Sequence, residues 1–206
     1  KKYALQSAAM CIDNETQYVV AVVGGRTQND QYNRAFLSKR QPGSTIKPLL
    51  DYAPAIDNGV INGSTVINDH KVYWDNTNKK SYSPSNSGGY HGNVTVREGL
   101  ARSLNTVAFQ IFKEVGTETA MNYLDKLQFS SLSYADNLAP AVSLGGFTYG
   151  VTINDMCRGY ATLENNGKMS SRTCLVKIEH ETNGTVYEAP EIEDSETEVY
   201  SADTSF

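Results

Sequence analysis

The chain has 206 residues, which is enough for one large hydrophobic core or two small ones. Its net charge is −5, and its Lys and Arg residues do not cluster into the basic stripe that nucleic-acid-binding proteins carry. We therefore expect no nucleic acid partner. No apolar run approaches the roughly 18 residues of a membrane span, and no signal peptide is visible. Because the chain begins inside a strand-like pattern, we expect an excised domain.

Much of the acidity lies at the C-terminal end. Segment 188–206 contains seven acidic residues and no basic one, which is typical of a solvated or mobile strip. The three cysteines, Cys11, Cys157 and Cys174, fit no zinc or redox spacing, and their apolar neighbours favour buried free thiols, although one pair could be oxidised. The three histidines are scattered, so we expect no metal site.

The N-terminal part predicts a hairpin. Residues 8–12 and 18–23 are apolar runs on either side of a turn at 13–16. Because their apolarity is continuous rather than alternating, we expect strands that are covered on both faces. Segment 26–40 is polar and predicts a loop.

A helix is expected to start at Ser44, after Pro42 and Gly43, and to end near Asn58. Pro48 falls in its first turn, where proline is tolerated. Pro54 lies deeper and should kink or shorten the helix.

This helix start carries the pattern Ser-x-x-Lys. Positions i and i+3 share one helix face, so Lys47 can reach over Ser44. A serine hydroxyl is a poor nucleophile until a base takes its proton, and a desolvated lysine with a lowered pKa can do so. By itself the pattern also describes an ordinary helix start with a solvated lysine.

Segment 61–93 is rich in Asn, Ser, Gly and Tyr, with strand-like runs at 64–67 and 71–74. A loop this long is usually functional or mobile. Its aromatic residues could line a substrate groove or simply pack on the surface; they are Trp74, Tyr82 and Tyr90.

A second pattern, Ser-x-Asn, lies at Ser103 and Asn105. Thr95 and Glu98 form a capping-box pattern that starts a helix over 96–102, and Thr106 begins the next helix. The joint between two helices can aim both side chains into one cleft, although the two residues could also be ordinary caps. Further helices are expected after Thr117 and over 153–164, a strand at 175–178, a turn at 183–184 and a helix start at 201–204.

Several ordered blocks resemble one family. Segments 40–49 and 94–105 resemble the first two motifs of the transpeptidase domain of class A penicillin-binding proteins, which belong to the penicillin-recognising serine enzymes. Further similar segments are 8–25, 32–35, 143–146 and 150–152. The resemblance implies an α+β, sandwich-like fold of the penicillin-binding-protein and β-lactamase type.

The third motif of that family, Lys-Thr-Gly, does not occur in the sequence. The nearest run is Arg172-Thr173-Cys174, where a side chain replaces the glycine that must lie against substrate. The resemblance therefore implies that residues 1–206 are the N-terminal two-thirds of a single transpeptidase domain, made of its helical part and first strands. A second polypeptide would supply the strand of the third motif, its neighbouring strands and a C-terminal helix, or these elements are absent.

The resemblance also implies a function: a D,D-transpeptidase that cross-links peptidoglycan stem peptides on the extracytoplasmic face of the bacterial membrane, with an anchor upstream. Ser44 would attack the D-Ala-D-Ala carbonyl and Lys47 would accept its proton. Ser103 would pass a proton to the leaving D-alanine, and Asn105 would hold the substrate amide and orient Lys47. The expected partners are the stem peptide, β-lactam antibiotics and the rest of the domain, without cofactor or metal.

Three alternatives remain open. A serine β-lactamase shares the first two motifs, although the Glu-x-x-Leu-Asn that would position a deacylating water is absent. A D,D-carboxypeptidase shares them as well and differs in the final acceptor. A non-catalytic module that binds or senses β-lactams, or an inactive fragment, is the third.

Overall fold

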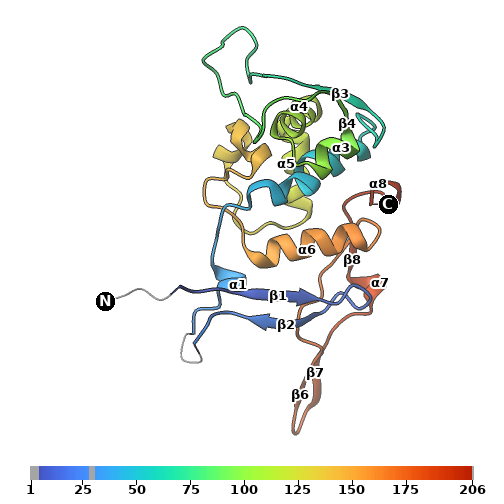
Figure 1. Cartoon of the computed structure of the whole chain (residues 1–206). Helices are drawn as coiled ribbons and strands as arrows, with labels where there is room; N and C mark the ends of the chain where they lie inside the picture. The colour runs from blue at the N-terminus through green and yellow to red at the C-terminus, as the bar shows by residue number, and fades with distance from the viewer. Residues whose placement is uncertain (1–4, 28–30, 206) are drawn as a thin grey trace. The chain divides into compact units, whose positions relative to one another are not determined.

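The computed structural model describes residues 5–27 and 31–205 (Figure 1). The chain forms two compact units. One unit combines the residues up to Ser38 with those from Thr152 onward, and the other comprises residues 39–151. Helices and short two-stranded sheets alternate along the chain, so the α+β class expected from the sequence is confirmed.

The predicted N-terminal hairpin is present in the first unit. Strand β1 (Ala9–Ile12) pairs antiparallel with β2 (Val19–Val23). Cover on both faces is not found in the described part of the chain, because Val20 and Val23 are more than half exposed. The physical reason is that β2 has only β1 as a sheet neighbour among the described residues.

Helix α6 organises the rest of the first unit. It spans Ile153–Glu164, as the sequence predicted, and Thr152 and Asp155 form a capping box at its start. The helix packs against β1 and β5, and β5 pairs antiparallel with β8. The other elements of this unit are α1 (Arg34–Leu37), β5 (Lys168–Ser170), β6 (Lys177–His180), β7 (Gly184–Glu188), α7 (Ile192–Ser195), β8 (Glu196–Glu198) and α8 (Ala202–Ser205).

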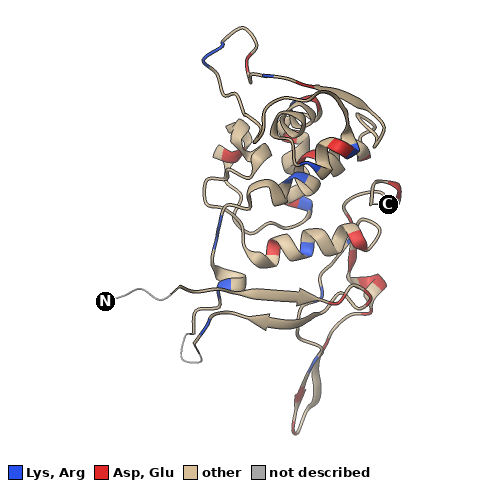
Figure 2. Ribbon diagram, in the orientation of Figure 1, with Lys and Arg blue, Asp and Glu red and all other residues tan. Residues whose placement is uncertain are grey.

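The acidic C-terminal segment contributes to the core of this unit. Val199 and Tyr200 are buried, and two backbone N–H groups bind the carbonyl of Gly167. Acidic side chains gather on α7 and near it, whereas Lys and Arg are scattered over the chain (Figure 2). No helix in the described ranges is both long enough and apolar enough to span a membrane.

The three thiols are free, as the sequence analysis favoured, but two of them are not buried. Cys11 and Cys174 are exposed, and Cys157 is partly buried. Cys11 lies on β1, whose residues alternate between exposed and partly buried positions, so its apolar neighbours do not enclose it.

The second unit begins with the helix predicted from Ser44, which changes type twice. A 3₁₀ turn, η1 (Gly43–Ile46), leads into a π-helix, η2 (Pro48–Tyr52), and then into α2 (Ala53–Asp57). Pro54 has no N–H to donate to the preceding turn, and the N–H of Ala53 reaches five residues back to Pro48. The prolines therefore account for the irregular helix that the sequence predicted.

Helix α4 (Asn105–Val115) lies at the centre of this unit, where its buried side chains pack against η2, α2, α3, α5 and η4. The remaining elements are β3 (Val66–Asp69), β4 (Gly92–Thr95), α3 (Val96–Ala101), α5 (Thr117–Lys126), η3 (Tyr134–Leu138) and η4 (Pro140–Leu144). The core includes Tyr52, Ala55, Ile61, Val94, Val96, Leu104, Val107, Ala108 and Ile111.

The long polar segment is partly a sheet. β3 pairs antiparallel with β4, which the sequence analysis missed because Gly92 and Asn93 are poor strand formers. The strand suggested at 71–74 does not form. Trp74 and Tyr82 lie with their ring centroids 5.9 and 5.7 Å from that of Phe109, which favours the packing interpretation of these aromatics.

Candidate active site

Three of the four predicted site residues are in direct contact, all within the second unit. The Lys47 Nζ donates to the Ser103 carbonyl at 2.8 Å, to the Ser103 Oγ at 3.1 Å and to the Asn105 Oδ1 at 2.7 Å. The two patterns, far apart in sequence, therefore meet at one ammonium group.

The joint between α3 and α4 gives Ser103 its position. Its φ of +53° lies in the left-handed region, which is uncommon for a residue other than glycine and is often found at functional sites. The helices are held close at this joint, since a Cβ added to Gly99 would lie 2.7 Å from the Val107 Cγ1. Close packing and the left-handed turn together direct the Ser103 carbonyl and hydroxyl toward Lys47.

Burial makes Lys47 a better base than an ordinary lysine. Only 1% of the residue is exposed, and desolvation lowers the pKa of its ammonium to about 8, although the Coulombic effect of Asp51 opposes this shift. A lysine with this pKa has an appreciable neutral fraction near neutral pH and can accept a proton.

Asp51 is the ionisable neighbour that the sequence analysis missed. It lies four residues after Lys47 on the π-helix, is fully buried, and neither carboxyl oxygen has a hydrogen-bond partner among the described residues. Burial raises the pKa of Asp51 well above its usual range, while the charge of Lys47 lowers it. The i, i+4 spacing was the signal that could have indicated the pair.

Ser44 lies on the 3₁₀ turn one turn before Lys47 and is exposed. Among the described residues, no hydrogen bond joins its hydroxyl to the Lys47 Nζ, whose donors are directed to residues 103 and 105. Hydrogen bonds of this kind often tighten only when substrate is present, so the geometry is compatible with a nucleophile and its base.

A glycine contact fixes the turn that carries Ser44. Gly145 has a φ of +82°, and a Cβ there would lie 2.4 Å from the backbone N and O of Gly43. Nearby, the Gln41 amide donates to the Phe147 carbonyl at 2.6 Å and accepts from the Phe147 N–H at 2.7 Å. The segment from Gly145 to Phe147 therefore supports the turn. Its sequence signals were the pair of glycines and the resemblance of 143–146 to the family.

The amide of Asn105 is fixed at both ends. Its Oδ1 accepts from Lys47, and its Nδ2 donates to the Ser85 carbonyl at 2.8 Å. Ser85 belongs to the long polar segment 61–93, so that segment reaches the site through a backbone carbonyl. The aromatic residues proposed for a groove do not make this contact.

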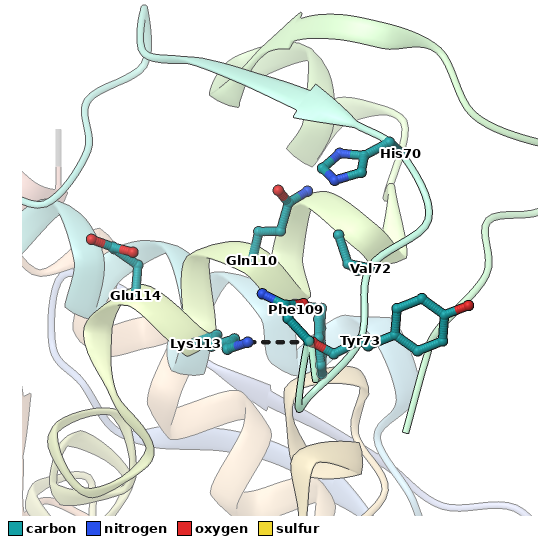
Figure 3. Close-up of a pocket in the computed structure, with 8 residues that line it drawn as sticks. His70, Val72, Tyr73, Phe109, Gln110, Lys113 and Glu114 are labelled. Atoms are coloured by element: carbon teal, nitrogen blue, oxygen red, sulfur yellow. Dashed lines mark hydrogen bonds between the residues drawn. The ribbon is translucent and has the colours of Figure 1, made fainter. Parts of the chain in front are cut away.

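One polar pocket of about 390 Å³ lies elsewhere on this unit (Figure 3). None of the four predicted site residues lines it. Its lining residues are His70, Val72, Tyr73, Asn76, Phe109, Gln110, Lys113 and Glu114. In the described part of the chain, no group of three or more His, Cys, Asp and Glu side chains could hold a metal ion.

Comparison with known proteins identifies the family. The model of the penicillin-binding protein transpeptidase domain matches residues 7–200. Penicillin-binding protein 4 of Bacillus subtilis is 34% identical over 98% of this chain, and penicillin-binding protein 1A of Escherichia coli is 33% identical over 90%. The chain spans 31% and 21% of the lengths of these two relatives.

Solved structures agree with these matches. The crystal structure of penicillin-binding protein 1A from Haemophilus influenzae superposes with a TM-score of 0.74 at 28% identity, covering 89% of this chain and 27% of that one. The PonA1 protein from Mycobacterium tuberculosis, at 19% identity, shares the fold with a TM-score of 0.81 over 97% of this chain and 53% of that chain. The chain belongs to the penicillin-binding protein transpeptidase domain family.

Proposed function

We propose that this chain carries the acyl-transfer site of a serine-type D,D-transpeptidase, with Ser44 as nucleophile and Lys47 as general base. The observation that carries the proposal is the buried Lys47 ammonium, held between Ser103 and Asn105 one helical turn after an exposed serine. A buried lysine with a pKa of about 8 suits proton transfer from a hydroxyl near neutral pH.

In the first step, the Ser44 Oγ bonds to the carbonyl carbon between the two terminal D-alanines of a stem peptide. Lys47 takes the hydroxyl proton, and the carbonyl oxygen becomes an oxyanion that the Ser44 N–H and a second donor stabilise. The C–N bond then breaks. The departing D-alanine nitrogen receives a proton from Ser103, which lies 3.1 Å from the Lys47 Nζ and is reprotonated by it.

An amine of a second stem peptide completes the reaction. It attacks the Ser44 ester and forms the cross-link, while Lys47 and Ser103 pass the amine's proton to the departing Ser44 oxygen, which regenerates the hydroxyl. A β-lactam ring presents a similar carbonyl, so it acylates Ser44 but leaves an ester that reacts slowly. Asn105, with its Oδ1 on Lys47 and its Nδ2 on Ser85, presents its amide to the substrate backbone after a small adjustment.

Residues 1–206 form part of a transpeptidase domain in this proposal, and the Lys-Thr-Gly strand comes from chain outside this sequence. The partial coverage of each relative supports this view. The reaction takes place at the cell wall, outside the cytoplasmic membrane, on stem peptides that end in D-Ala-D-Ala.

The test uses the longest natural polypeptide that contains these residues, incubated with a fluorescent penicillin. We expect one covalent adduct that peptide mapping assigns to Ser44, and Ser44→Ala should abolish it. Ser103→Ala is the matched control, because it should slow labelling without moving the adduct. An adduct on any other residue would overturn the assignment of the nucleophile.

The lifetime of the adduct distinguishes the alternatives. A β-lactamase releases hydrolysed penicillin within seconds to minutes, whereas a transpeptidase keeps the label for hours. Release of D-alanine with formation of a cross-linked dimer from stem-peptide substrates would separate a transpeptidase from a carboxypeptidase, which yields the shortened peptide alone, and from a sensing module, which yields neither.

A further inference from the structure

A buried carboxylate outside the proposed machinery lies behind Asn105. Asp69 is the last residue of β3 and is 1% exposed. Its oxygens accept from the Asn86 Nδ2 at 2.8 and 3.0 Å and from the His91 backbone N–H at 2.8 Å. A third donor is the Thr106 hydroxyl. Several donors converge on one buried carboxylate, which compensates its lost hydration.

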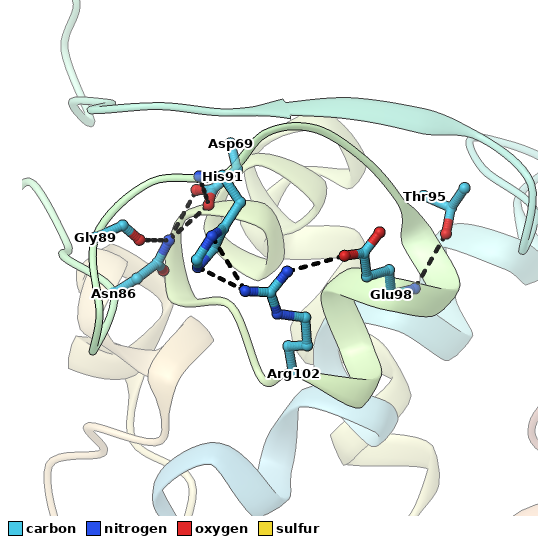
Figure 4. Close-up of polar contacts among 7 residues, drawn as sticks. All are labelled: Asp69, Asn86, Gly89, His91, Thr95, Glu98 and Arg102. Carbon is cyan, nitrogen blue, oxygen red and sulfur yellow. Dashed lines mark hydrogen bonds and ion pairs between the residues drawn. The ribbon is translucent and has the colours of Figure 1, made fainter.

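Figure 4 shows that residues of one loop, Asn86 and His91, are hydrogen-bonded to this carboxylate. The Asn86 Nδ2 also contacts the Gly89 carbonyl at 3.2 Å, so both ends of the turn 86–91 are fixed to Asp69. Farther out, the Arg102 guanidinium lies 3.0 and 3.1 Å from the ring nitrogens of His91 and pairs with Glu98 at 2.9 Å. In this outer layer Arg102 and Glu98 are exposed and His91 is partly buried, whereas Asp69 and Thr106 are buried.

The loop and the site are connected through two neighbouring pairs. Asn86 accepts from the Thr106 N–H at 3.1 Å, and Ser85, the residue before it, accepts from the Asn105 Nδ2 at 2.8 Å. Residues 85–86 therefore lie against residues 105–106. Asp69 binds Asn86 and Thr106, and Lys47 binds Asn105, which in turn binds Ser85. Displacement of Asn86 would move the Ser85 carbonyl, which is the one hydrogen-bond acceptor of the Asn105 Nδ2 among the described residues.

We infer that Asp69 is a positioning residue for acyl transfer: through Asn86 and Thr106 it holds the Ser85 carbonyl, which orients the Asn105 amide so that its Oδ1 faces Lys47. This inference rests on the proposed function of Lys47 and Asn105. Without the Ser85 acceptor, the amide of Asn105 could rotate and present its NH₂ group to the ammonium, which would repel it.

The inference predicts a specific pH signature. The Asn105 Oδ1 accepts a hydrogen bond from the charged form of Lys47, so loss of this hydrogen bond should lower the pKa of Lys47. The acidic limb of the profile of acylation rate against pH should then move to lower pH. Asp51 is the ionisable group that acts on Lys47, and it stays the same in every variant. Near Asp69 the charged groups are Arg102 and Glu98, which are exposed, together with the partly buried His91.

Two pairs of variants test the inference in the full natural protein. Asp69→Asn keeps the shape but cannot accept from all three donors, and Thr106→Val replaces the hydroxyl with a methyl group. We expect both to lower the rate of penicillin acylation, the first by about tenfold to a hundredfold, as expected when a reacting group is misplaced by about 1 Å. Thr106→Ser retains the hydroxyl and should retain most of the rate. Glu98→Gln, in the exposed layer, should leave it unchanged.

The readouts separate positioning from stability and from failure of the proposed function. The pKa of Lys47, followed by ¹⁵N NMR of the lysine side chains, should fall in Asp69→Asn and Thr106→Val and remain unchanged in Thr106→Ser. An unchanged Lys47 pKa in the first two variants, or equal acylation by Thr106→Val and Thr106→Ser, would overturn the inference. If the wild-type protein forms no Ser44 adduct, the proposed function fails, and the NMR titration still decides whether Asp69 sets the state of Lys47.

Discussion

The Lys47 Nζ lies 2.7 Å from the Asn105 Oδ1, and the two residues are separated by 58 positions in the sequence. The ammonium thus takes its acceptors from Ser103, on the joint that precedes α4, and from Asn105, the first residue of α4, rather than from its own helix. Its burial and its acceptors have opposite effects on its charge, because burial disfavours the ammonium and the acceptors favour it.

Replacement of Lys47 should remove the base without removing the fold. Lys47→Met keeps an unbranched side chain in the buried space, and we expect it to slow penicillin acylation by about a hundredfold or more, the usual effect of losing a general base. Lys47→Ala should slow it as much but also leave a cavity. Stopped-flow acylation and thermal melting would measure the two effects; acylation by Lys47→Met within a few-fold of wild type would show that another group is the base.

Asp51 should make stability fall as the pH rises. Burial raises its folded-state pKa above the unfolded value of about 3.9, so the stability that its proton contributes is complete below that value and is lost as pH rises through the folded-state pKa. Asp51→Asn removes this titration. We expect the free energy of unfolding of wild type, measured by urea titration from pH 4 to pH 7, to decline relative to that of Asp51→Asn. Parallel curves would mean that Asp51 titrates normally.

Gly145 should tolerate no side chain. Gly145→Ala adds a Cβ where only 2.4 Å separates it from the backbone of Gly43, at a φ that alanine rarely adopts. We expect a loss of stability of about 1–3 kcal/mol from the backbone strain, and slower acylation because the turn before Ser44 must shift. Gly184→Ala is the matched control, since its φ is +73° but no atom lies within 4 Å of the added Cβ. Equal acylation by both variants would argue against the contact.

The chain alone should acylate slowly. An oxyanion hole needs two donors, and in the proposed reaction one belongs to the Lys-Thr-Gly strand, which this sequence does not contain. Loss of one donor costs about 2.7–4 kcal/mol, or roughly a hundredfold to a thousandfold in rate. The test compares residues 1–206 with a polypeptide extended through the third motif. Equal acylation rates would show that the first two motifs suffice.

The exposed strand β2 should make the short chain prone to aggregation. Val20 and Val23 are more than half exposed on a strand with one sheet neighbour in the described part of the chain. An uncovered apolar edge offers a template for pairing with other chains. Light scattering should therefore detect association of residues 1–206 at concentrations at which the extended polypeptide remains monomeric, and Val20→Lys should reduce it.

Local rules predicted much of the fold because they depend on residues close in sequence. The turn at Asp13, the helix start after Thr95 and the helix over 153–164 all appear in the structure. The irregular helix after Ser44 followed from Pro54. Strand β4 was missed because its pairing with β3, and not its own composition, holds Gly92 and Asn93 extended.

The site was predictable only in part. Ser44, Lys47, Ser103 and Asn105 form recognisable patterns, and the last three are in contact. Asp69 lacks such a pattern, because it matters through neighbours that the fold brings from other segments. Asp51 stands four residues after Lys47, and Gly145 lies in a segment that resembles the family. The burial of Asp51 and the contact of Gly145 with Gly43, however, depend on the folded structure. The burial of Cys11 was predicted from adjacent residues alone, and the open face of the hairpin made that prediction wrong.

The reciprocal contact between Gln41 and Phe147 has a consequence for the order of folding. These residues are 106 positions apart, so closing the chain between them carries a larger entropic cost than forming the hairpin or the individual helices. The turn that bears Ser44 therefore gains its final geometry late, after most helical structure has formed. During refolding, capture of a fluorescent penicillin would report completion of the fold, lagging behind the recovery of the far-ultraviolet circular dichroism signal.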